Sequence, residues 1–318
     1  MAVYKDIRDI SFEKNVVTVG SFDGVHSGHR LLLQRVVDLA TQNKLRSVVL
    51  TFWPHPRYVL SPKNETPLLL NTLDEKITLL KQSGVDDVLV FPFDETLSKM
   101  SASDFIKDII IGKLNARHLV VGQDHHFGNG RGGNVHQLPE FVSKNDLYVD
   151  VVDLKKLDRK ISSSEIRNFL LCGNLILANE MLGYEYMITG KVIDGRRIGR
   201  TIGFPTANIE TPEYKLLPKE GVYSVKVKSL NKLGMLYIGK RPVFKQENPY
   251  PTLPTGTGVT SESLHVEVNI FDFDQQIYGQ VITIVLTHYI RDNTTFENVE
   301  QLATQLNRDK QNIIRISS

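Results

Sequence analysis

Cysteine and long apolar runs are what this sequence lacks most clearly. Cys172 is the only cysteine among 318 residues, which excludes an intrachain disulfide and leaves no CxxC pair for zinc or redox chemistry. No apolar stretch reaches the roughly 18 residues that a membrane-spanning helix requires. Residues 1–15 mix acidic and basic side chains before any apolar segment, which is unlike a secretory signal. We therefore expect a globular protein that resides in the cytoplasm.

An excess of charge of one sign is also missing. The chain has 38 Lys and Arg against 36 Asp and Glu, a formal net charge of +2. This balance gives no reason to expect nucleic acid or an acidic membrane as the main partner. Any anion that binds this protein must therefore be recognised by local groups.

Two different patterns divide the chain near residue 183. Residues 16–183 alternate β-rich runs such as "VVTVG" and "SVVLTF" with helical periodicity, which predicts a parallel sheet in a doubly wound α/β domain. After Gly183, β-rich runs such as "GVYSVKVKSL" are separated by Gly, Pro and Asn, which is typical of a small antiparallel barrel or sandwich. We expect two domains, 1–183 and 184–318.

Apolar residues at helical spacing predict two amphipathic helices in particular. The second helix, near the C-terminal end of the sequence, is expected to cover one side of the barrel. The apolar positions are Leu73, Ile77 and Leu80 in the first helix, and Val299, Leu302 and Leu306 in the second.

The segment "VGSFDGVHSGHRLLLQ", residues 19–34, joins a strand to a helix through a glycine-rich turn. Gly20 allows a tight turn, Gly24 lets the backbone approach a ligand, and the free N–H groups at the helix start point into the same space. His26 and His29 share a face of the first helical turn, so both can donate hydrogen bonds to phosphate oxygens. The segment predicts an anion site.

Other interpretations of these histidines remain open at this stage. Two histidines at the start of a helix could also be solvated helix-cap residues. Together with Asp23, they are also residue types that can bind zinc. The spacing argues against zinc, because two histidines on one helix usually bind zinc at i and i+4. A second metal signal, "DHH" from Asp124 to His126, is only three letters long and has no acidic metal-binding segments around it.

The segment "GRRIGRTIGFPTANIE", residues 195–210, is too rich in glycine for a good helix and predicts a loop. Gly199 and Gly203 permit the approach of a phosphate, while Thr206 and Asn208 offer oxygen ligands suited to a magnesium ion that keeps several waters. A plain turn between strands is the alternative.

Five segments, taken in order, resemble the motifs of one family. "GSFDGVHSGH" resembles the GxFDGxHxGH signature of the nucleotidyltransferase superfamily. With "TFWPHP", "VGQDHHFGNGRGG", "ISSSEIR" and "GRTIGFPTAN", it resembles the bifunctional bacterial riboflavin kinase/FMN adenylyltransferase (FAD synthetase) family over almost the whole chain. The resemblance implies an N-terminal Rossmann-like nucleotidyltransferase domain followed by a small antiparallel β-barrel riboflavin kinase domain with a C-terminal helix.

This resemblance implies two transferase reactions. Riboflavin would be phosphorylated by ATP to FMN, and FMN would receive AMP from a second ATP to give FAD and pyrophosphate, each step with Mg²⁺. The partners would be riboflavin, FMN and ATP, without nucleic acid or membrane, and weak self-association is allowed. The alternatives are another nucleotidyltransferase fused to an inactive barrel, and a flavin-binding sensor or storage protein.

For the first domain, the resemblance assigns phosphate and flavin contacts residue by residue. "ISSSEIR" also places hydroxyls at a helix start, although an ordinary N-cap would look the same. The catalytic histidines would be His26 and His29; the nucleotide-binding residues would be Gly20, Phe22, Asp23, Gly24, Asp124, Ser163, Ser164 and Arg167; and the flavin side would be Trp53, His55 and Pro56. For Trp53, core packing is an equally good interpretation.

For the second domain, the resemblance assigns a catalytic base, a metal site and a nucleotide loop. Glu267, in "LHVEVNIFDFDQQIYG", would orient the 5′-hydroxyl of riboflavin, although a strand carboxylate usually just faces solvent. The other residues are Thr206 and Asn208 for the metal, Gly199 and Gly203 for the nucleotide, and Arg291 for the flavin. The sequence departs from the family pattern at His125, Tyr237, Val243 and the long loop 245–263.

Overall fold

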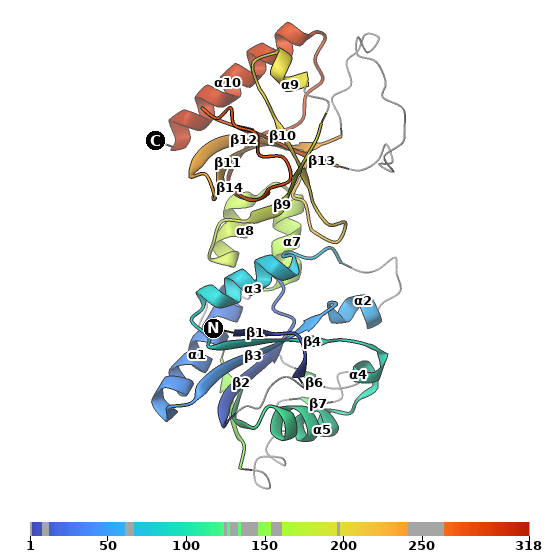
Figure 1. Cartoon of the computed structure of the whole chain (residues 1–318), viewed down its shortest axis with the longest axis vertical. Helices are drawn as coiled ribbons and strands as arrows, with labels where there is room; N and C mark the ends of the chain where they lie inside the picture. Colours follow the sequence, from blue (N-terminus) through green and yellow to red (C-terminus); the bar gives the residue numbers. More distant parts are fainter. Residues whose placement is uncertain are drawn as a thin grey trace. The chain divides into compact units, whose positions relative to one another are not determined.

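The protein is described here by a computed structural model in which the chain forms two compact units, Met1–Ser163 and Ser164–Ser318 (Figure 1). The structure describes residues 2–7, 13–60, 67–123, 126–127, 133–134, 146–153, 161–195, 198–240 and 264–317. Asp124, His125, Val243 and the loop 245–263 lie outside these residues. Each unit is described separately.

The first unit is built on a six-stranded sheet with the order β1-β4-β3-β2-β5-β8, in which every pair of neighbours is parallel. The strands are β1 (Ala2–Tyr4), β2 (Asn15–Gly20), β3 (Arg46–Trp53), β4 (Asp87–Pro92), β5 (Ala116–Gly122) and β8 (Tyr148–Val152), and a separate pair joins β6 (His126–Phe127) to β7 (Gly133–Asn134). The predicted parallel sheet is confirmed. β2 lies inside the sheet and is buried on both faces, so its valines Val16, Val17 and Val19 are all buried, although the neighbours Val16 and Val17 point to opposite faces.

The helices of this unit are α1 (Ser27–Asn43), α2 (Pro56–Leu60), α3 (Leu73–Gln82), α4 (Glu95–Lys99), α5 (Ala102–Asp104) and the π-helix η3 (Phe105–Lys113). α3 buries Leu79 and Leu80 together with the polar Glu75 and Lys76, whereas Ile77 is only half-buried. The predicted helix is therefore present, but it is rotated away from the face that the apolar spacing indicated.

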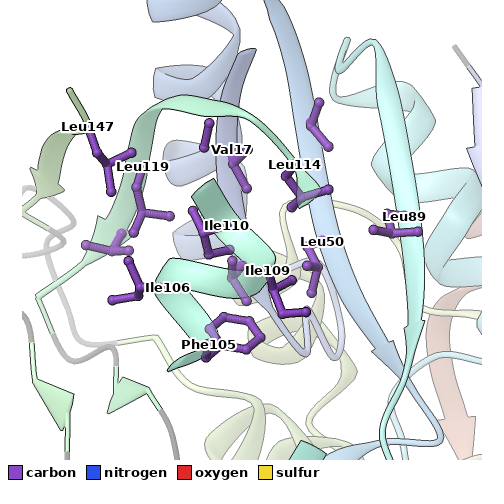
Figure 2. Packing of buried hydrophobic residues seen from close by; sticks show 14 residues of the cluster. Val17, Leu50, Leu89, Phe105, Ile106, Ile109, Ile110, Leu114, Leu119 and Leu147 are labelled. Atoms are coloured by element: carbon purple, nitrogen blue, oxygen red, sulfur yellow. The ribbon is translucent and has the colours of Figure 1, made fainter. Parts of the chain in front are cut away.

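The π-helix η3 supplies a large part of the first unit's core. Its wider turns are closed by bonds such as the one that the Leu114 N–H donates to the Ile109 carbonyl, at 2.9 Å. Figure 2 shows the cluster, to which η3 contributes Phe105, Ile106, Ile109 and Ile110, packed with strand residues such as Val17, Leu50, Leu89 and Leu119. This apolar contact fixes the sheet from which the functional loops emerge.

The second unit is a closed antiparallel barrel with the strand order β10-β13-β12-β11-β14-β9. Its strands are β9 (Met187–Ile193), β10 (Ala207–Glu210), β11 (Gly221–Val227), β12 (Lys232–Gly239), β13 (His265–Ile270) and β14 (Val281–Arg291). Its helices are α7 (Ser163–Leu171), which begins at the last residue of the first unit, α8 (Leu175–Leu182), α9 (Ile198–Thr201) and α10 (Val299–Ser317). The predicted barrel is confirmed, and closure removes its strand edges.

The C-terminal helix α10 packs on the barrel, as expected. Leu306 and the fully buried Ile313 of this helix join a cluster with Phe204, Val222 and Phe271. Among the described residues, none of the helices combines the length and apolar character that crossing a bilayer demands.

Helices α7 and α8 belong to the same compact unit as the barrel. The Asn179 amide accepts a hydrogen bond from the Tyr186 N–H at 2.8 Å and donates one to the Leu286 carbonyl at 3.2 Å. The Lys219 N–H donates to the Leu170 carbonyl at 2.9 Å. The boundary between the two compact units lies at 163/164, twenty residues before the predicted domain boundary at 183/184. Whether the domains can be separated at 183/184 stays a prediction.

A fragment of residues 164–318 should therefore be more stable than one of residues 184–318. The shorter fragment lacks three buried apolar side chains of α8, Leu175, Met181 and Leu182. At about 1.5–3 kcal/mol for each, the loss should reach about 5 kcal/mol. Circular dichroism during urea unfolding measures the difference, and equal midpoints for the two fragments would contradict it.

Candidate active sites

The turn after β2 places a loop at the carboxyl end of the parallel sheet, where ligands bind in open α/β folds. Phe22 and Val25 have left-handed backbone angles, with φ of 48° and 35°, and Gly24 between them has φ of 86°. Such angles are unusual for residues with a side chain. The turn is held in part by the bond from the Val25 N–H to the Phe22 carbonyl, and by the Phe22 ring, which is 1% exposed.

His26 and His29 stack on each other at the start of α1. Their ring centroids lie 3.6 Å apart with an interplanar angle of 14°, which confirms that they share a face. His26 is the N-cap, because its Nδ1 accepts a hydrogen bond from the His29 N–H at 3.3 Å. Phe22 packs its ring edge-on against His29 at 5.2 Å, so its side chain supports the histidine, and its contact with a nucleotide stays a prediction.

Burial keeps both imidazoles neutral near pH 7. It lowers the pKa of His26 from 6.5 to about 4, against a smaller upward effect of its own backbone hydrogen bond. The pKa of His29 is also lowered well below its usual value, first by burial and then by electrostatic interaction with His26 and Lys76. The Nδ1 atom of His29 is buried and has no hydrogen-bond partner among the described residues. Neutral rings that are partly unsatisfied are poised to donate to an incoming anion.

Asp23 joins three segments around this loop. Its carboxylate, only 4% exposed, accepts a hydrogen bond from the Leu70 N–H at 2.9 Å, and its carbonyl accepts one from the Ser163 hydroxyl at 2.9 Å. Ser163 is thus brought to the loop as the sequence predicts. Ser164 and Arg167 follow it on α7 in the second unit, and nothing in the structure tests their contact with a nucleotide.

Lys76 is a residue of this site that sequence reasoning missed. It lies on α3, is 4% exposed, and donates from Nζ to the carbonyls of Ser21 and Phe52 and to the Thr51 hydroxyl. Burial lowers its pKa from 10.5 to about 8, although Asp23 acts in the opposite direction. One feature of the sequence could have indicated that Lys76 is buried. It precedes Leu79 and Leu80 by three and four residues, which puts it on the same face of the helix as these two apolar side chains.

The residues at the end of β3 and just after it differ in how deeply they are buried. His55 is buried, and its Nδ1 accepts a hydrogen bond from the Arg57 N–H at 3.2 Å; Pro56 is the first residue of α2. Trp53 is half-buried, and the Lys76 ammonium lies 5.8 Å from its ring centroid. A half-buried ring is compatible with both core packing and a flavin contact.

In the barrel, a hydroxyl just before β10, an amide on β10 and a carboxylate on the adjacent strand β13 come from neighbouring positions. Thr206 donates from its hydroxyl to Glu267 Oε2 at 3.3 Å. Asn208 is the direct register partner of Glu267 between β10 and β13. The loop before β10 is also tied to β13, because the Asn269 amide donates to the Pro205 carbonyl at 2.7 Å. Glu267 is half-buried, so it is not simply a solvent-facing strand residue.

The glycine-rich loop contains a short helical turn, which corrects the expectation of a purely irregular loop. α9 spans Ile198–Thr201, and the Phe204 N–H donates back to the Gly199 carbonyl at 2.8 Å. A Cβ on Gly199 would lie 2.1 Å from the Phe204 carbonyl oxygen, so this glycine is needed for the loop's own closure. Gly203 has φ of +78°, which favours glycine for the turn that follows.

A cavity of about 170 Å³ lies beside this loop in the barrel unit. Its walls include the apolar Val192, Ile270 and Tyr278, the cationic Arg200, and Thr206. Thr206 therefore faces the cavity and contacts Glu267 at the same time. Asp274 and Gln275 also line it, so the cavity carries both signs of charge as well as apolar side chains.

Arg291 is engaged within the protein. Its guanidinium forms a paired contact with the buried carboxylate of Asp309 on α10, with Nη2 to Oδ2 at 2.8 Å. Arg291 thus anchors α10 to the end of β14, and its contact with a flavin stays a prediction.

Tyr237 is the register partner of Glu267 between β12 and β13, and its hydroxyl donates to the Lys240 carbonyl.

Comparison with known proteins matches each unit to a separate family model. The FAD synthetase model matches residues 9–165, and the riboflavin kinase model matches residues 182–317. The bifunctional riboflavin kinase/FMN adenylyltransferase of Bacillus subtilis is 37% identical over 96% of this chain and 93% of the relative. The protein of the same description from Escherichia coli is 34% identical over 93% and 90%.

The chain belongs to the bifunctional riboflavin kinase/FMN adenylyltransferase family. A solved structure described as a macrolide-efflux protein from Streptococcus pneumoniae is 32% identical, has a TM-score of 0.80, and matches over 97% of each chain. The fold that the resemblance implied, a Rossmann-like unit and a barrel, is therefore shared by the whole length of a solved relative.

The lowered pKa of His26 makes the stability of the first unit depend on pH. The unfolded chain binds a proton on this residue below about pH 6.5, while the folded chain resists it until about pH 4. Stability should therefore fall as the pH drops through this window, by roughly 3 kcal/mol for His26 alone. His26→Asn keeps a good N-cap, does not titrate, and should flatten this part of the curve.

Trp53 makes the measurement specific, because it is the only tryptophan and lies in the first unit. Urea unfolding followed by its fluorescence, at several pH values from about 7 to about 4, compares wild type, His26→Asn and the exposed control His288→Asn. Parallel curves for wild type and His26→Asn would contradict the prediction.

Proposed function

We propose that this chain makes FMN from riboflavin and ATP in its barrel domain and then FAD from FMN and a second ATP in its α/β domain. Family membership supports the two activities. The geometric observation that carries the proposal is that Thr206 both lines a cavity and donates to Glu267. This arrangement supports a site in which the hydroxyl of riboflavin would lie next to the phosphate donor.

In the kinase reaction, the 5′-hydroxyl of riboflavin attacks the γ-phosphorus of ATP. Its proton passes to the carboxylate of Glu267, the bond to the β-phosphate oxygen breaks, and ADP leaves. Glu267 can do this because it is half-buried and held by the Thr206 hydroxyl. Gly199 and Gly203 shape the loop over the phosphates, and Arg200 adds a cation to the cavity wall.

Magnesium fits the donors of the barrel site. Thr206, just before β10, Asn208 on β10 and Glu267 on β13 provide hydroxyl, amide and carboxylate oxygens, the ligand class that Mg²⁺ prefers. We propose that Thr206 and Asn208 hold the ion together with the ATP phosphates. When bound, it neutralises phosphate charge; the protein's own residues orient the hydroxyl and accept its proton.

In the adenylylation reaction, a phosphate oxygen of FMN attacks the α-phosphorus of ATP and pyrophosphate leaves. Little covalent work falls to the protein, so alignment and charge stabilisation supply the rate. His26 and His29 donate to the phosphates at the N-terminus of α1, joined by Gly20, Asp23 and Gly24 of the loop. Asp124, Ser163, Ser164 and Arg167 complete the nucleotide contacts. Trp53, His55 and Pro56 belong to the flavin side of this site, whereas Arg291 belongs to the flavin side of the separate kinase site in the barrel.

One incubation separates this proposal from its alternatives. With riboflavin, ATP and Mg²⁺, chromatography should show FMN first and FAD later. A flavin sensor or storage protein would return unchanged riboflavin bound to the protein, and a different nucleotidyltransferase with an inactive barrel would make neither product and leave the riboflavin unbound. We propose the cytoplasm as the location and riboflavin, FMN and ATP as the partners, with weak self-association allowed.

Replacing His29 by alanine should reduce FAD formation from FMN by about 100-fold or more, since a donor aimed at developing phosphate charge is worth at least that much. Kinase activity on the same preparation should stay near wild type. His118→Ala, another partly buried histidine of the first unit, serves as the control. Equal loss of both activities in folded His29→Ala would point to a structural role.

Replacing Glu267 by glutamine should reduce FMN formation by about 100- to 10,000-fold, the usual range for loss of a general base. Glutamine keeps the size and hydrogen-bonding shape, so the loss should appear in kcat more than in KM. FMN supplied directly should still become FAD. Glu210→Gln, on an exposed position of β10, is the matched control. A kinase rate within threefold of wild type would refute the role of Glu267.

A further inference from the structure

Lys76 connects the two loops between which the adenylylation substrates are proposed to lie. Its ammonium has three protons and three acceptors, the Ser21 carbonyl at 3.0 Å, the Thr51 hydroxyl at 3.2 Å and the Phe52 carbonyl at 3.3 Å. Ser21 opens the phosphate-side loop after β2, whereas Thr51 and Phe52 lie in the last three residues of β3, just before Trp53 and the rest of the flavin-side segment. One side chain therefore bridges both.

The α3 segment is itself tied to the phosphate-side loop by a second bond. The Leu70 N–H, just before the helix, donates to the Asp23 carboxylate at 2.9 Å. The helix start is fixed by a capping box in which the Thr72 hydroxyl accepts from the Glu75 N–H, and the Glu75 carboxylate accepts from the Thr72 N–H. Lys76 follows in the next position, so its backbone has little freedom to move relative to the loop.

The three contacts of the ammonium are all neutral, so they orient the charge without cancelling it. The charged or titratable groups that act on it are the Asp23 carboxylate from the loop and His29 from α1, while the Trp53 ring faces it from the end of β3. A buried cation without a bonded counter-ion costs stability, and such a group is usually retained for function. Positive charge beside His29 also favours phosphate at this site.

We propose that Lys76 is a positioning residue for FMN adenylylation, which holds the phosphate-side loop and the flavin-side segment at the separation that in-line attack requires. This inference rests on the proposed function of the first domain. Lys76 would act on the reaction through the two loops that it holds. Its loss would let them move apart, and a displacement of about 1 Å between reacting groups can reduce a rate by about 100-fold.

Two substitutions separate the hydrogen-bonded bridge from simple bulk. Lys76→Met keeps the length of the side chain but donates nothing, and should lower the kcat of FAD formation from FMN by about 100-fold. The KM for ATP should change by less than about threefold. Lys76→Gln can still donate two hydrogen bonds and should recover about tenfold of the lost kcat. Lys81→Met, exposed on the same helix, should behave as wild type.

The readouts exclude a merely structural effect. Trp53 fluorescence reports the folded fraction of the first unit, and the kinase rate on the same preparation reports the amount of active barrel. In native Lys76→Met, the Trp53 emission should also shift, because the nearby charge is gone. A kcat within threefold of wild type, or Lys76→Gln no better than Lys76→Met, overturns the inference.

If Lys76→Met does not fold, Thr51→Val carries the test, since it keeps the size of the side chain but removes one acceptor of the ammonium and the bond that the Thr51 hydroxyl itself donates to the Ser21 carbonyl. It should lower the same kcat several-fold, and an unchanged kcat overturns the inference. Failure of the proposed function would look different: wild type itself would then make no FAD from FMN and ATP.

Discussion

The first domain depends on keeping four ionisable side chains out of water at one edge of a parallel sheet. Asp23, His26 and Lys76 are each at most 6% exposed, and His29 buries its Nδ1. Because both histidines are neutral near pH 7, the site holds one anion, Asp23, and one cation, Lys76, and these two charges balance. A triphosphate would therefore be bound mainly by hydrogen-bond donors, the neutral imidazoles and the N–H groups at the start of α1, rather than by a net positive charge.

The barrel site must also bind phosphate groups, but the charged group of its central cluster is an anion, the carboxylate of Glu267. Its cluster of Thr206, Asn208 and Glu267 contains one carboxylate and two neutral oxygen donors, and the Arg200 cation is on the cavity wall. A carboxylate near phosphate is repulsive unless a cation lies between them. The donor chemistry therefore explains why a magnesium ion suits this site, while buried histidines and a lysine already provide positive or hydrogen-donating groups in the other.

Much of this could be predicted from the sequence, because the informative residues stand in short motifs. The parallel sheet, the barrel and the covering helix follow from periodicity, and the stacked His26 and His29 follow from their spacing at a helix start. Lys76 could not be found in this way, since a lysine on an amphipathic helix is solvent-facing by default. Burial of a long polar side chain is decided by what packs above it, which in this case is the end of β3.

The glycine-rich loop shows the same limit at the level of the backbone. A glycine in a sequence permits several things, and close approach of a phosphate is only one of them. Gly199 is required because the Phe204 carbonyl occupies the space of its Cβ, so its role is to close the loop on itself. The loop must close to bring Thr206 against Glu267. The glycine therefore serves the phosphate site indirectly, by fixing where the hydroxyl and carboxylate meet.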